Sequence, residues 1–265
     1  MSKAEMAEVA RLYYVRDLTQ QDIAERLGVS RFKVLRLLEQ ARAEGVVRFE
    51  IDEPARVDDD LSRALEERYR LSSALVVDDV ATAAASLLPR VLRPDDVLGV
   101  AWGETLAAIE RRLAPPGPGV PVVQVCGAIE GLAPGTGPTE LAARYAAWSG
   151  GAFHPLEAPA VADEGALRRA VGPTTAIFDH VSVALVGIGA RADGAGHILV
   201  HVFDRDGRII SAERSIALSV EQLRRTRVIA VAAGRGKRTA VAGALRSGLL
   251  DTLVTDAACA KAALE

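Results

Sequence analysis

The chain has 265 residues, of which 49% are hydrophobic and 25% are charged, and its formal net charge is −3. These values are typical of a globular protein with one large and one small domain. The sequence contains no run of eighteen apolar residues and no apolar core of a signal peptide, so we expect a cytoplasmic protein with no membrane partner.

The first 45 residues predict three helices. Residues 4–15 carry apolar side chains at helical spacing, which predicts the first. Thr19 and Asp22 have the spacing of a capping box, so a second helix is expected to begin after Thr19. Gly28 suits a left-handed turn, and Ser30 suits the cap of a third helix that begins at Arg31. This order is typical of a helix-turn-helix.

The third predicted helix has an apolar face and a basic face. The apolar positions are Val34, Leu37, Leu38 and Ala41. Six Lys and Arg residues face two Glu residues between positions 26 and 48. An ordinary pair of packed helices is the alternative, but the capped corner and the basic face favour a helix that enters the major groove of a double-stranded DNA operator. The candidate phosphate contacts are Gln20, Gln21 and Arg42, and the candidates for base contact are Arg31, Lys33 and Arg36, with Ser30 and Phe32 beside them.

Residues 46–51 alternate apolar and charged side chains, which predicts a strand that forms a wing beside the third helix. Arg48 would then reach a phosphate. Pro54 ends this strand and acidic residues follow. We therefore predict a helix-turn-helix DNA-binding domain over residues 1–53 and a second domain over residues 54–265.

The second domain alternates helical and strand patterns. A polar helix is predicted over residues 57–69, and short apolar runs follow at 74–77, 97–101, 122–126, 181–187, 228–232 and 252–254. Such alternation predicts a doubly wound α/β fold with a mostly parallel sheet. Residues 198–203 and 208–210 interrupt the pattern and predict a hairpin.

Four predicted strand ends carry glycines. Carboxyl ends of parallel strands meet at one edge of a sheet, where open α/β folds bind ligands. Backbone amides and a lysine at this edge would suit a small phosphate, although each glycine alone could serve only a tight turn. The candidate residues are Gly99, Trp102, Gly103, Thr105, Gly127, Gly187, Gly189, Gly234, Gly236 and Lys237. Asp256, after the last strand, could bind sugar hydroxyls or cap the final helix.

Other motifs are excluded by spacing. The segment around Lys237 is not a phosphate-binding P-loop, because Val231 and Arg238 replace the required Gly and Ser or Thr. His197 and His201 would lie about 13 Å apart in one strand, which argues against a shared metal. Cys126 and Cys259 have no disulfide or zinc spacing. We expect no metal and no cofactor.

Taken together, the chain resembles the SorC family of bacterial transcriptional regulators over nearly its whole length. The resemblance rests on residues 18–24, 27–31, 34, 36–38 and 41–47 in the first domain, and on 99–106, 183–189, 233–237 and 253–256 in the second. Leu35 and Phe32 stand where the family often has Ser and Pro, a departure that bears on which DNA sequence is read. The chain is also shorter than typical members around residues 78–96 and 127–140.

The resemblance implies a second domain similar in fold to sugar-phosphate isomerases and glucosamine-phosphate deaminases, serving as a sensor. It implies that Trp102, Gly103, Thr105, Gly127, Gly234, Gly236 and Lys237 line an effector pocket, and that the protein forms a homodimer or homotetramer. The expected function is regulation of a carbohydrate-related operon by a small phosphorylated sugar, with no catalytic residues.

Two other functions stay open from the residues. One is a sugar-phosphate isomerase or deaminase with a DNA-binding appendage, which would need a paired acid and base. Its candidate acids are Glu104, Asp163, Asp179 and Asp256, which have no spacing that identifies a pair. The other is a DNA-binding protein whose second domain is purely structural and independent of any effector.

Overall fold

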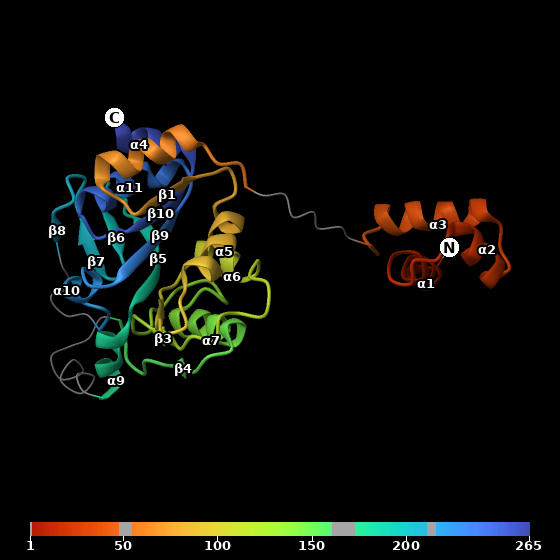
Figure 1. Ribbon diagram of the computed structural model, residues 1–265, viewed down its shortest axis with the longest axis horizontal. Helices are drawn as coiled ribbons and strands as arrows, with labels where there is room; N and C mark the ends of the chain where they lie inside the picture. The colour runs from red at the N-terminus through yellow and green to blue at the C-terminus, as the bar shows by residue number, and fades with distance from the viewer. Residues whose placement is uncertain (1, 48–54, 161–172, 211–215) are drawn as a thin grey trace. The chain divides into compact units, whose positions relative to one another are not determined.

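The computed structural model describes residues 2–47, 55–160, 173–210 and 216–265 (Figure 1). The chain divides into two compact units, residues 1–53 and 54–265.

The first unit is a three-helix helix-turn-helix. Its helices are α1 (Lys3–Tyr14), α2 (Gln20–Leu27) and α3 (Arg31–Ala43). The Thr19 hydroxyl accepts a hydrogen bond from the Asp22 amide at 3.2 Å, and the Asp22 carboxylate accepts one from the Thr19 amide at 3.1 Å. Gly28 has φ +63°, and Ser30 caps α3 through the Lys33 amide. The local signals in the sequence therefore predicted these helices correctly.

The predicted wing is not formed at its first residues. Val46 and Val47 lie in a bend after α3, and the rest of the predicted strand, including Arg48, lies outside the described residues. Gly45 has φ +68°, and the Val47 amide donates to the Ala41 carbonyl at 2.9 Å. This bond turns the chain back onto the end of α3, where both valines pack against the helical core.

The second unit is built on a seven-stranded parallel sheet in the order β1-β10-β9-β5-β2-β3-β4. These strands are β1 (Ser73–Val76), β2 (Leu98–Val100), β3 (Val122–Gln124), β4 (Phe153–His154), β5 (Val183–Ala190), β9 (Arg227–Ala232) and β10 (Thr252–Thr255). Most of their residues are buried, as strands covered on both faces must be. The predicted doubly wound α/β class is confirmed.

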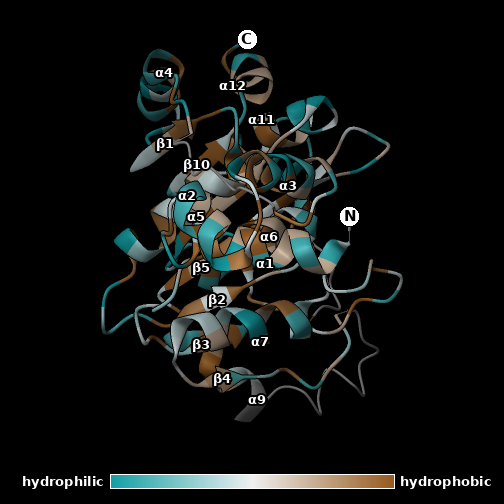
Figure 2. Ribbon diagram, turned by 90° about the vertical axis from the view of Figure 1, so that its right-hand side faces the viewer, coloured by the Kyte–Doolittle hydropathy of each residue, from teal (hydrophilic) through white to brown (hydrophobic). Residues whose placement is uncertain are grey.

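Helices cover the sheet in two rows. One row is α4 (Asp59–Tyr69), α12 (Ala257–Leu264) and α11 (Arg238–Arg246), and the other is α5 (Val80–Val91), α6 (Glu104–Glu110) and α7 (Pro138–Ser149). Short helical segments are α9 (Pro173–Ala176), η1 (Ile177–His180), α10 (Val220–Leu223) and η2 (Arg235–Lys237). Figure 2 shows hydrophobic residues concentrated on the strands between these helices. Among the described residues, no helix is long and apolar enough to cross a bilayer.

An antiparallel extension departs from the prediction. The expected continuous strand over residues 198–203 is two strands, β6 (Gly196–Ile198) and β7 (His201–Phe203), joined by a turn in which Leu199 has φ +52°. β6 pairs with the far end of β5, and β8 (Ile209–Ile210) pairs with β7. His197 lies opposite Val202, so the separation of about 13 Å expected for one extended strand does not apply. The turn buries both Ile198 and Phe203.

The direction of the chain across the sheet reverses between β2 and β5. From β2 the chain proceeds outward through β3 and β4, and from β5 it proceeds the other way through β9 and β10. Ligands of open α/β sheets bind outside the carboxyl ends of the strands that flank such a reversal. A ligand is therefore expected beside the residues that follow β2, β5 and β9.

Candidate functional site

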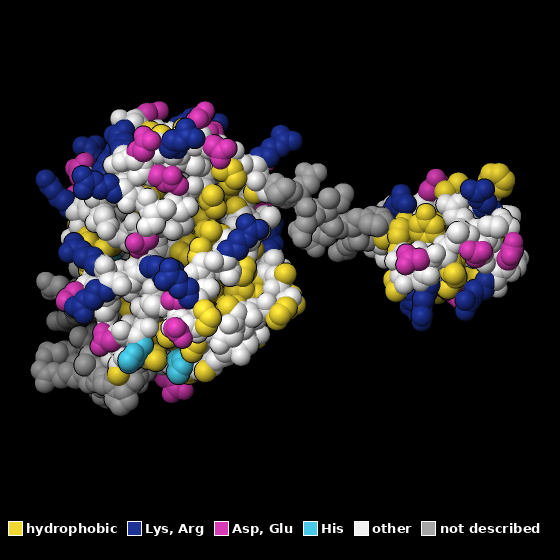
Figure 3. All heavy atoms as spheres, in the orientation of Figure 1, with side chains coloured by type: hydrophobic (Ala, Val, Ile, Leu, Met, Phe, Trp, Pro, Cys, Tyr) yellow, Lys and Arg dark blue, Asp and Glu magenta, His cyan; other side chains and the backbone are white. Residues whose placement is uncertain are grey.

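The outer face of α3 carries both basic and apolar side chains. Val34, Leu37 and Leu38 are buried against α1 and α2. Phe32 is 84% exposed and Leu35 is 39% exposed on the other face. Figure 3 shows basic and hydrophobic side chains side by side on the surface of this unit.

The predicted DNA-binding side chains differ in how strongly the unit already holds them. The Arg42 guanidinium donates to the Tyr14 hydroxyl at 2.7 and 3.0 Å. Lys33 lies 4.0 Å from the Glu5 carboxylate, and Gln21 donates to Glu25 at 2.8 Å. Arg36 is exposed and makes no hydrogen bond or ion pair with the described residues.

Gln20 and Arg31 connect the two helices of the motif. The Arg31 Nε atom lies 3.5 Å from the Gln20 Oε1 atom, at the limit of a hydrogen bond. Ser30 is engaged as the cap of α3. The packing of α3 against α2 in the helical core leaves Phe32 and Arg36 on the outer surface of the unit.

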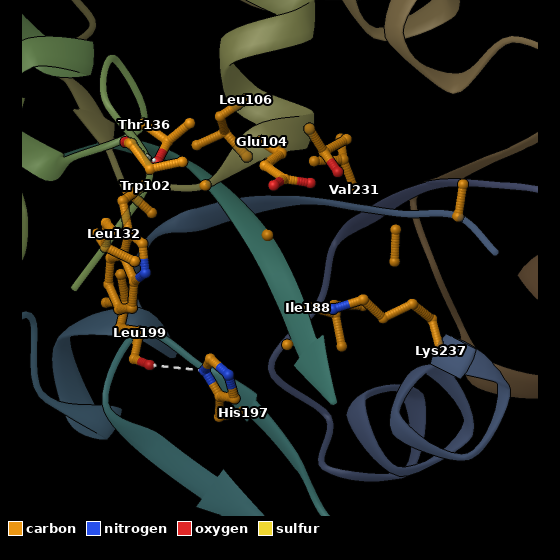
Figure 4. Close-up of a pocket in the computed structure, with 18 of the residues that line it drawn as sticks. Trp102, Glu104, Leu106, Leu132, Thr136, Ile188, His197, Leu199, Val231 and Lys237 are labelled. Atoms are coloured by element: carbon orange, nitrogen blue, oxygen red, sulfur yellow. Dashed lines mark hydrogen bonds between the residues drawn. The ribbon is translucent and has the colours of Figure 1, made fainter. Parts of the chain in front are cut away.

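The second unit has a cavity of about 630 Å³ at the sheet reversal (Figure 4). Its walls come from the ends of β2, β5 and β9, the start of α6, the loop before α7, and the β6 turn. The lining residues are Ala101, Trp102, Gly103, Glu104, Thr105, Leu106, Gly131, Leu132, Ala133, Thr136, Gly187, Ile188, Gly189, His197, Leu199, Val231, Ala232, Ala233 and Lys237.

One wall of the cavity is aromatic. The Trp102 and His197 rings are near parallel, with an interplanar angle of 20° and centroids 6.5 Å apart. His197 Nδ1 lies 3.0 Å from the Leu199 carbonyl oxygen, which can only accept, so Nδ1 carries the proton. Gly189 lies directly opposite His197, and a Cβ on it would come within 1.8 Å of the imidazole Nε2 atom. The glycine is therefore needed for this wall.

Burial lowers the pKa of His197, and the charges of Lys237 and Arg191 lower it further, against the opposing effect of the bond to Leu199. The imidazole is therefore neutral at pH 7. An uncharged aromatic wall of this kind suits the apolar face of a sugar or polyol.

Two charged side chains reach the cavity from different sides. Lys237 extends from η2 toward Ile188, and the Glu104 carboxylate comes from the start of α6 (Figure 4). The amides of Glu104 and Thr105 belong to the first turn of α6 and have no acceptor within that helix. The Gly103 amide donates to the Thr136 carbonyl at 3.0 Å, so this amide is not among those available to a ligand.

Six of the predicted effector residues meet at this cavity, and five do not line it. The six are Trp102, Gly103, Thr105, Gly187, Gly189 and Lys237; the five are Gly99, Gly127, Gly234, Gly236 and Asp256. Gly99 lies inside β2, where a Cβ would come within 2.5 Å of Val125. A Cβ on Gly127 would come within 2.4 Å of the Pro159 carbonyl. Both glycines permit close packing in the fold.

Asp256 serves as the cap of α12. Its carboxylate accepts the Cys259 amide at 2.7 Å and the Gly234 amide at 2.5 Å. Burial raises its pKa, but the backbone amide bonds outweigh burial and hold the pKa below its usual value. Of the two roles left open by the sequence, the cap is the one that these contacts build.

The candidate catalytic acids do not gather at the cavity. Glu104 lines it, whereas Asp179 accepts a hydrogen bond from Gln222 at 2.8 Å elsewhere in the unit. Asp163 lies outside the described residues. No cluster of three or more His, Cys, Asp or Glu side chains suited to a metal occurs within the described parts of the chain.

Several lining residues escaped the sequence analysis. Leu132 and Thr136 come from the loop before α7, His197 lies in β6, and Leu199 lies in the turn between β6 and β7. Only weak signals in the sequence point to these residues. For Leu132 and Thr136 the signal is a glycine-rich loop, and for His197 it is a histidine in a short segment that pairs with β5.

Comparison with known proteins supports both halves of this description. A family model described as "Putative sugar-binding domain" matches residues 54–198 and 190–265, and a sigma-70 region 4 model matches residues 3–44. The deoxyribonucleoside regulator of Bacillus subtilis (strain 168) is 30% identical over 298 residues, covering 96% of this chain and 95% of the relative. The sorbitol operon regulator of Klebsiella pneumoniae is 26% identical, covering 95% of this chain and 94% of the relative.

The crystal structure of full-length SorC, the Klebsiella pneumoniae sorbitol operon regulator, matches with a TM-score of 0.72 and 25% identity, covering 99% of each chain. The alignment with the Bacillus protein is longer than this chain of 265 residues, so that relative contains insertions. These relatives are named regulators rather than enzymes. The chain belongs to the SorC family of transcriptional regulators, with an N-terminal helix-turn-helix and a C-terminal sugar-binding domain.

Proposed function

We propose that this protein controls a carbohydrate-related operon by binding operator DNA through α3 and a small phosphorylated sugar in the cavity of the second unit. The observation that carries the proposal is a cavity at the sheet reversal with an aromatic wall, one lysine and one carboxylate. Two similar proteins are named for a deoxyribonucleoside and for a sorbitol operon, so sugars and polyols are the first ligands to test.

The two charges suggest how such a ligand would lie. A phosphate is stabilised by the Lys237 ammonium and repelled by the Glu104 carboxylate. The phosphate end of the ligand therefore lies nearer Lys237, and the sugar hydroxyls donate hydrogen bonds to the Glu104 carboxylate. The sugar carbons then face Trp102, whose ring offers an apolar surface.

On the DNA side, Arg31, Lys33 and Arg36 are the proposed base contacts, and Gln20, Gln21 and Arg42 are the proposed phosphate contacts. Tyr14 already orients Arg42, which reduces the entropy lost when it binds. One such unit has few basic groups, so we propose that the protein acts in the cytoplasm as a homodimer or homotetramer, with α3 helices about 34 Å apart on a palindromic site.

The proposal is tested with the full-length protein in two measurements. Selection from a random-sequence duplex pool gives an operator, and a gel-shift titration then measures affinity for it with and without phosphorylated pentoses, hexoses and hexitols. The same compounds and their unphosphorylated forms are screened by thermal shift. A ligand at 100 times its dissociation constant adds about 2.7 kcal/mol of stability.

We expect at least one phosphorylated compound to raise the melting temperature and to change operator affinity about 5- to 150-fold. Operator binding with no response to any compound would favour a DNA-binding protein with a structural second domain. Turnover of a sugar phosphate would favour an enzyme.

A further inference from the structure

The outer face of α3 exposes an apolar pair at the position where DNA is proposed to bind. Phe32 is 84% exposed, the highest value among the large hydrophobic residues of the described chain, and Leu35 is 39% exposed. Phe32 and Leu35 are three residues apart on one helix, so their side chains are neighbours on its surface. Exposed apolar side chains that lie together on a surface mark a contact site for a partner.

The surroundings of the pair favour DNA as that partner. Arg36 is one helical turn from Phe32, and Arg31 is one turn from Leu35, so the pair lies between two exposed cations. A protein-binding helix face of this size would usually be depleted in charge at its centre. Phosphates on both sides of a groove complement the two arginines, and the groove floor offers an apolar group of its own.

That apolar group is the 5-methyl of thymine. In the major groove only thymine presents a methyl, which distinguishes T·A from the other base pairs without any hydrogen bond. Phe32 and Leu35 have no hydrogen-bonding side-chain atoms, so they can read a base edge only through such contact.

We propose that Phe32 and Leu35 form a thymine-reading pair that gives this protein a preference for T·A pairs in each half-site. This inference rests on the proposed DNA binding and adds the class of base that is read. Phe32 contacts the base edge nearest the N-terminus of α3, and Leu35 contacts the adjacent base pair.

The test replaces single thymines of the selected operator by deoxyuridine, which removes only the methyl group. We expect one or two positions per half-site to lose about fourfold in affinity each, the equivalent of about 0.8 kcal/mol per buried methyl. The Phe32→Ser variant should bind its thymine and uracil operators equally at one of these positions. The Leu35→Ser variant should do so at the neighbouring position.

Matched controls keep the outcome sharp. Phe32→Leu retains an apolar side chain and should retain most of the thymine preference. Circular dichroism should show that each variant keeps its helix content, because Phe32 and Leu35 are both exposed. Wild-type protein that binds the operator but does not distinguish uracil from thymine would overturn the inference and leave the proposed function standing. Unchanged thymine preference in both serine variants would also overturn it. Failure to select any operator would instead contradict the proposed function.

Discussion

At the residue scale, Lys237 has a role that can be separated from the fold. It is the one cation among the described lining residues of the cavity, and Figure 4 shows its side chain directed inward. It takes no part in the buried core. Its replacement should therefore affect the ligand and leave the fold intact.

We predict that Lys237→Gln weakens binding of the phosphorylated effector about 10- to 150-fold, because it removes a charge-assisted hydrogen bond worth about 1.5–3 kcal/mol. Isothermal titration calorimetry measures the loss. The matched control is Lys261→Gln, on the exposed side of α12 and away from the cavity, which should bind normally. Equal losses in both variants would show that Lys237 does not contact the phosphate.

The aromatic wall shows a second dependence on one residue. Gly189 allows the His197 ring to lie against β5, and that ring in turn faces Trp102. The sequence marked Gly189 as a candidate for binding the ligand through its backbone. In the structure Gly189 has a further role, because its lack of a side chain leaves space for the His197 ring.

At the element scale, α2 depends on its capping box. The Thr19 hydroxyl lies 2.7 Å from the Asp22 carboxylate and also accepts the Asp22 amide at 3.2 Å. Both residues are exposed, so the capping box stabilises the end of the helix and contributes little to packing of the core.

We predict that Thr19→Ala destabilises the helix-turn-helix by about 1 kcal/mol because an amide of the first turn loses its acceptor. Amide hydrogen exchange over residues 20–43 of the full chain should then be about fivefold faster when it proceeds through opening of this unit. Thr19→Ser keeps the hydroxyl and should exchange at nearly the wild-type rate. Unchanged exchange in the alanine variant would mean that tertiary packing alone holds α2.

A second feature at the element scale is a hydrogen-bonded cluster that links three neighbouring strands, β2, β5 and β9, at their amino ends. Asp96, before β2, is 7% exposed and accepts from Ser182 at 2.7 Å, from the Arg93 amide at 2.7 Å and from Arg227 at 2.5 Å. Burial raises the pKa of Asp96, but these bonds and the Arg227 charge outweigh burial and lower the pKa below 3.8.

A carboxylate whose pKa is lower in the folded state stabilises the fold above its unfolded pKa, and the contribution is lost as the pH falls through its folded pKa. We predict that Asp96→Asn lowers the free energy of unfolding at pH 7 by about 1–3 kcal/mol and reduces the loss of stability between about pH 4 and pH 2. Urea titrations of both proteins across this range measure the difference. If the free energy of unfolding depends on pH in the same way in both proteins, the ionised Asp96 side chain does not stabilise the fold.

At the scale of the whole molecule, the proposed dimer makes operator spacing a geometric variable. Two recognition helices reach the same side of a duplex when their half-sites are 10–10.5 bp apart or a multiple of this. Joining two weak sites raises affinity only if both can bind together.

We predict that inserting 5 bp between the half-sites lowers affinity about 100-fold, whereas inserting 10 bp costs much less because the helical phase is restored. Gel-shift titration on the three duplexes gives the comparison, and analytical ultracentrifugation gives the oligomeric state. Equal affinity for all three would contradict paired binding and point to a single helix-turn-helix per site.

The helix-turn-helix was predictable from the sequence because its signals are local. The Thr19 capping box, the left-handed Gly28 and the buried stripe from Val34 to Ala41 each lie within a few residues of the structure that they specify. The parallel sheet was predictable for a related reason, since strands buried on both faces are continuous apolar runs. The first two residues of the predicted wing, Val46 and Val47, do not form a strand because Gly45 and the Val47 amide bond turn the chain back, and alternation alone does not show this.

By itself the sequence determined the class of each domain, because caps, apolar periodicity and glycine-bearing strand ends are properties of short segments. The family came from the resemblance of its motifs. Only the tertiary structure decided which glycines line the cavity and which permit close packing. Gly99 and Gly127 pack closely against Val125 and Pro159, and His197 lies near Trp102 because β6 pairs with the end of β5. Such contacts depend on strand order and register, which join residues far apart in the chain and leave no local trace in the sequence.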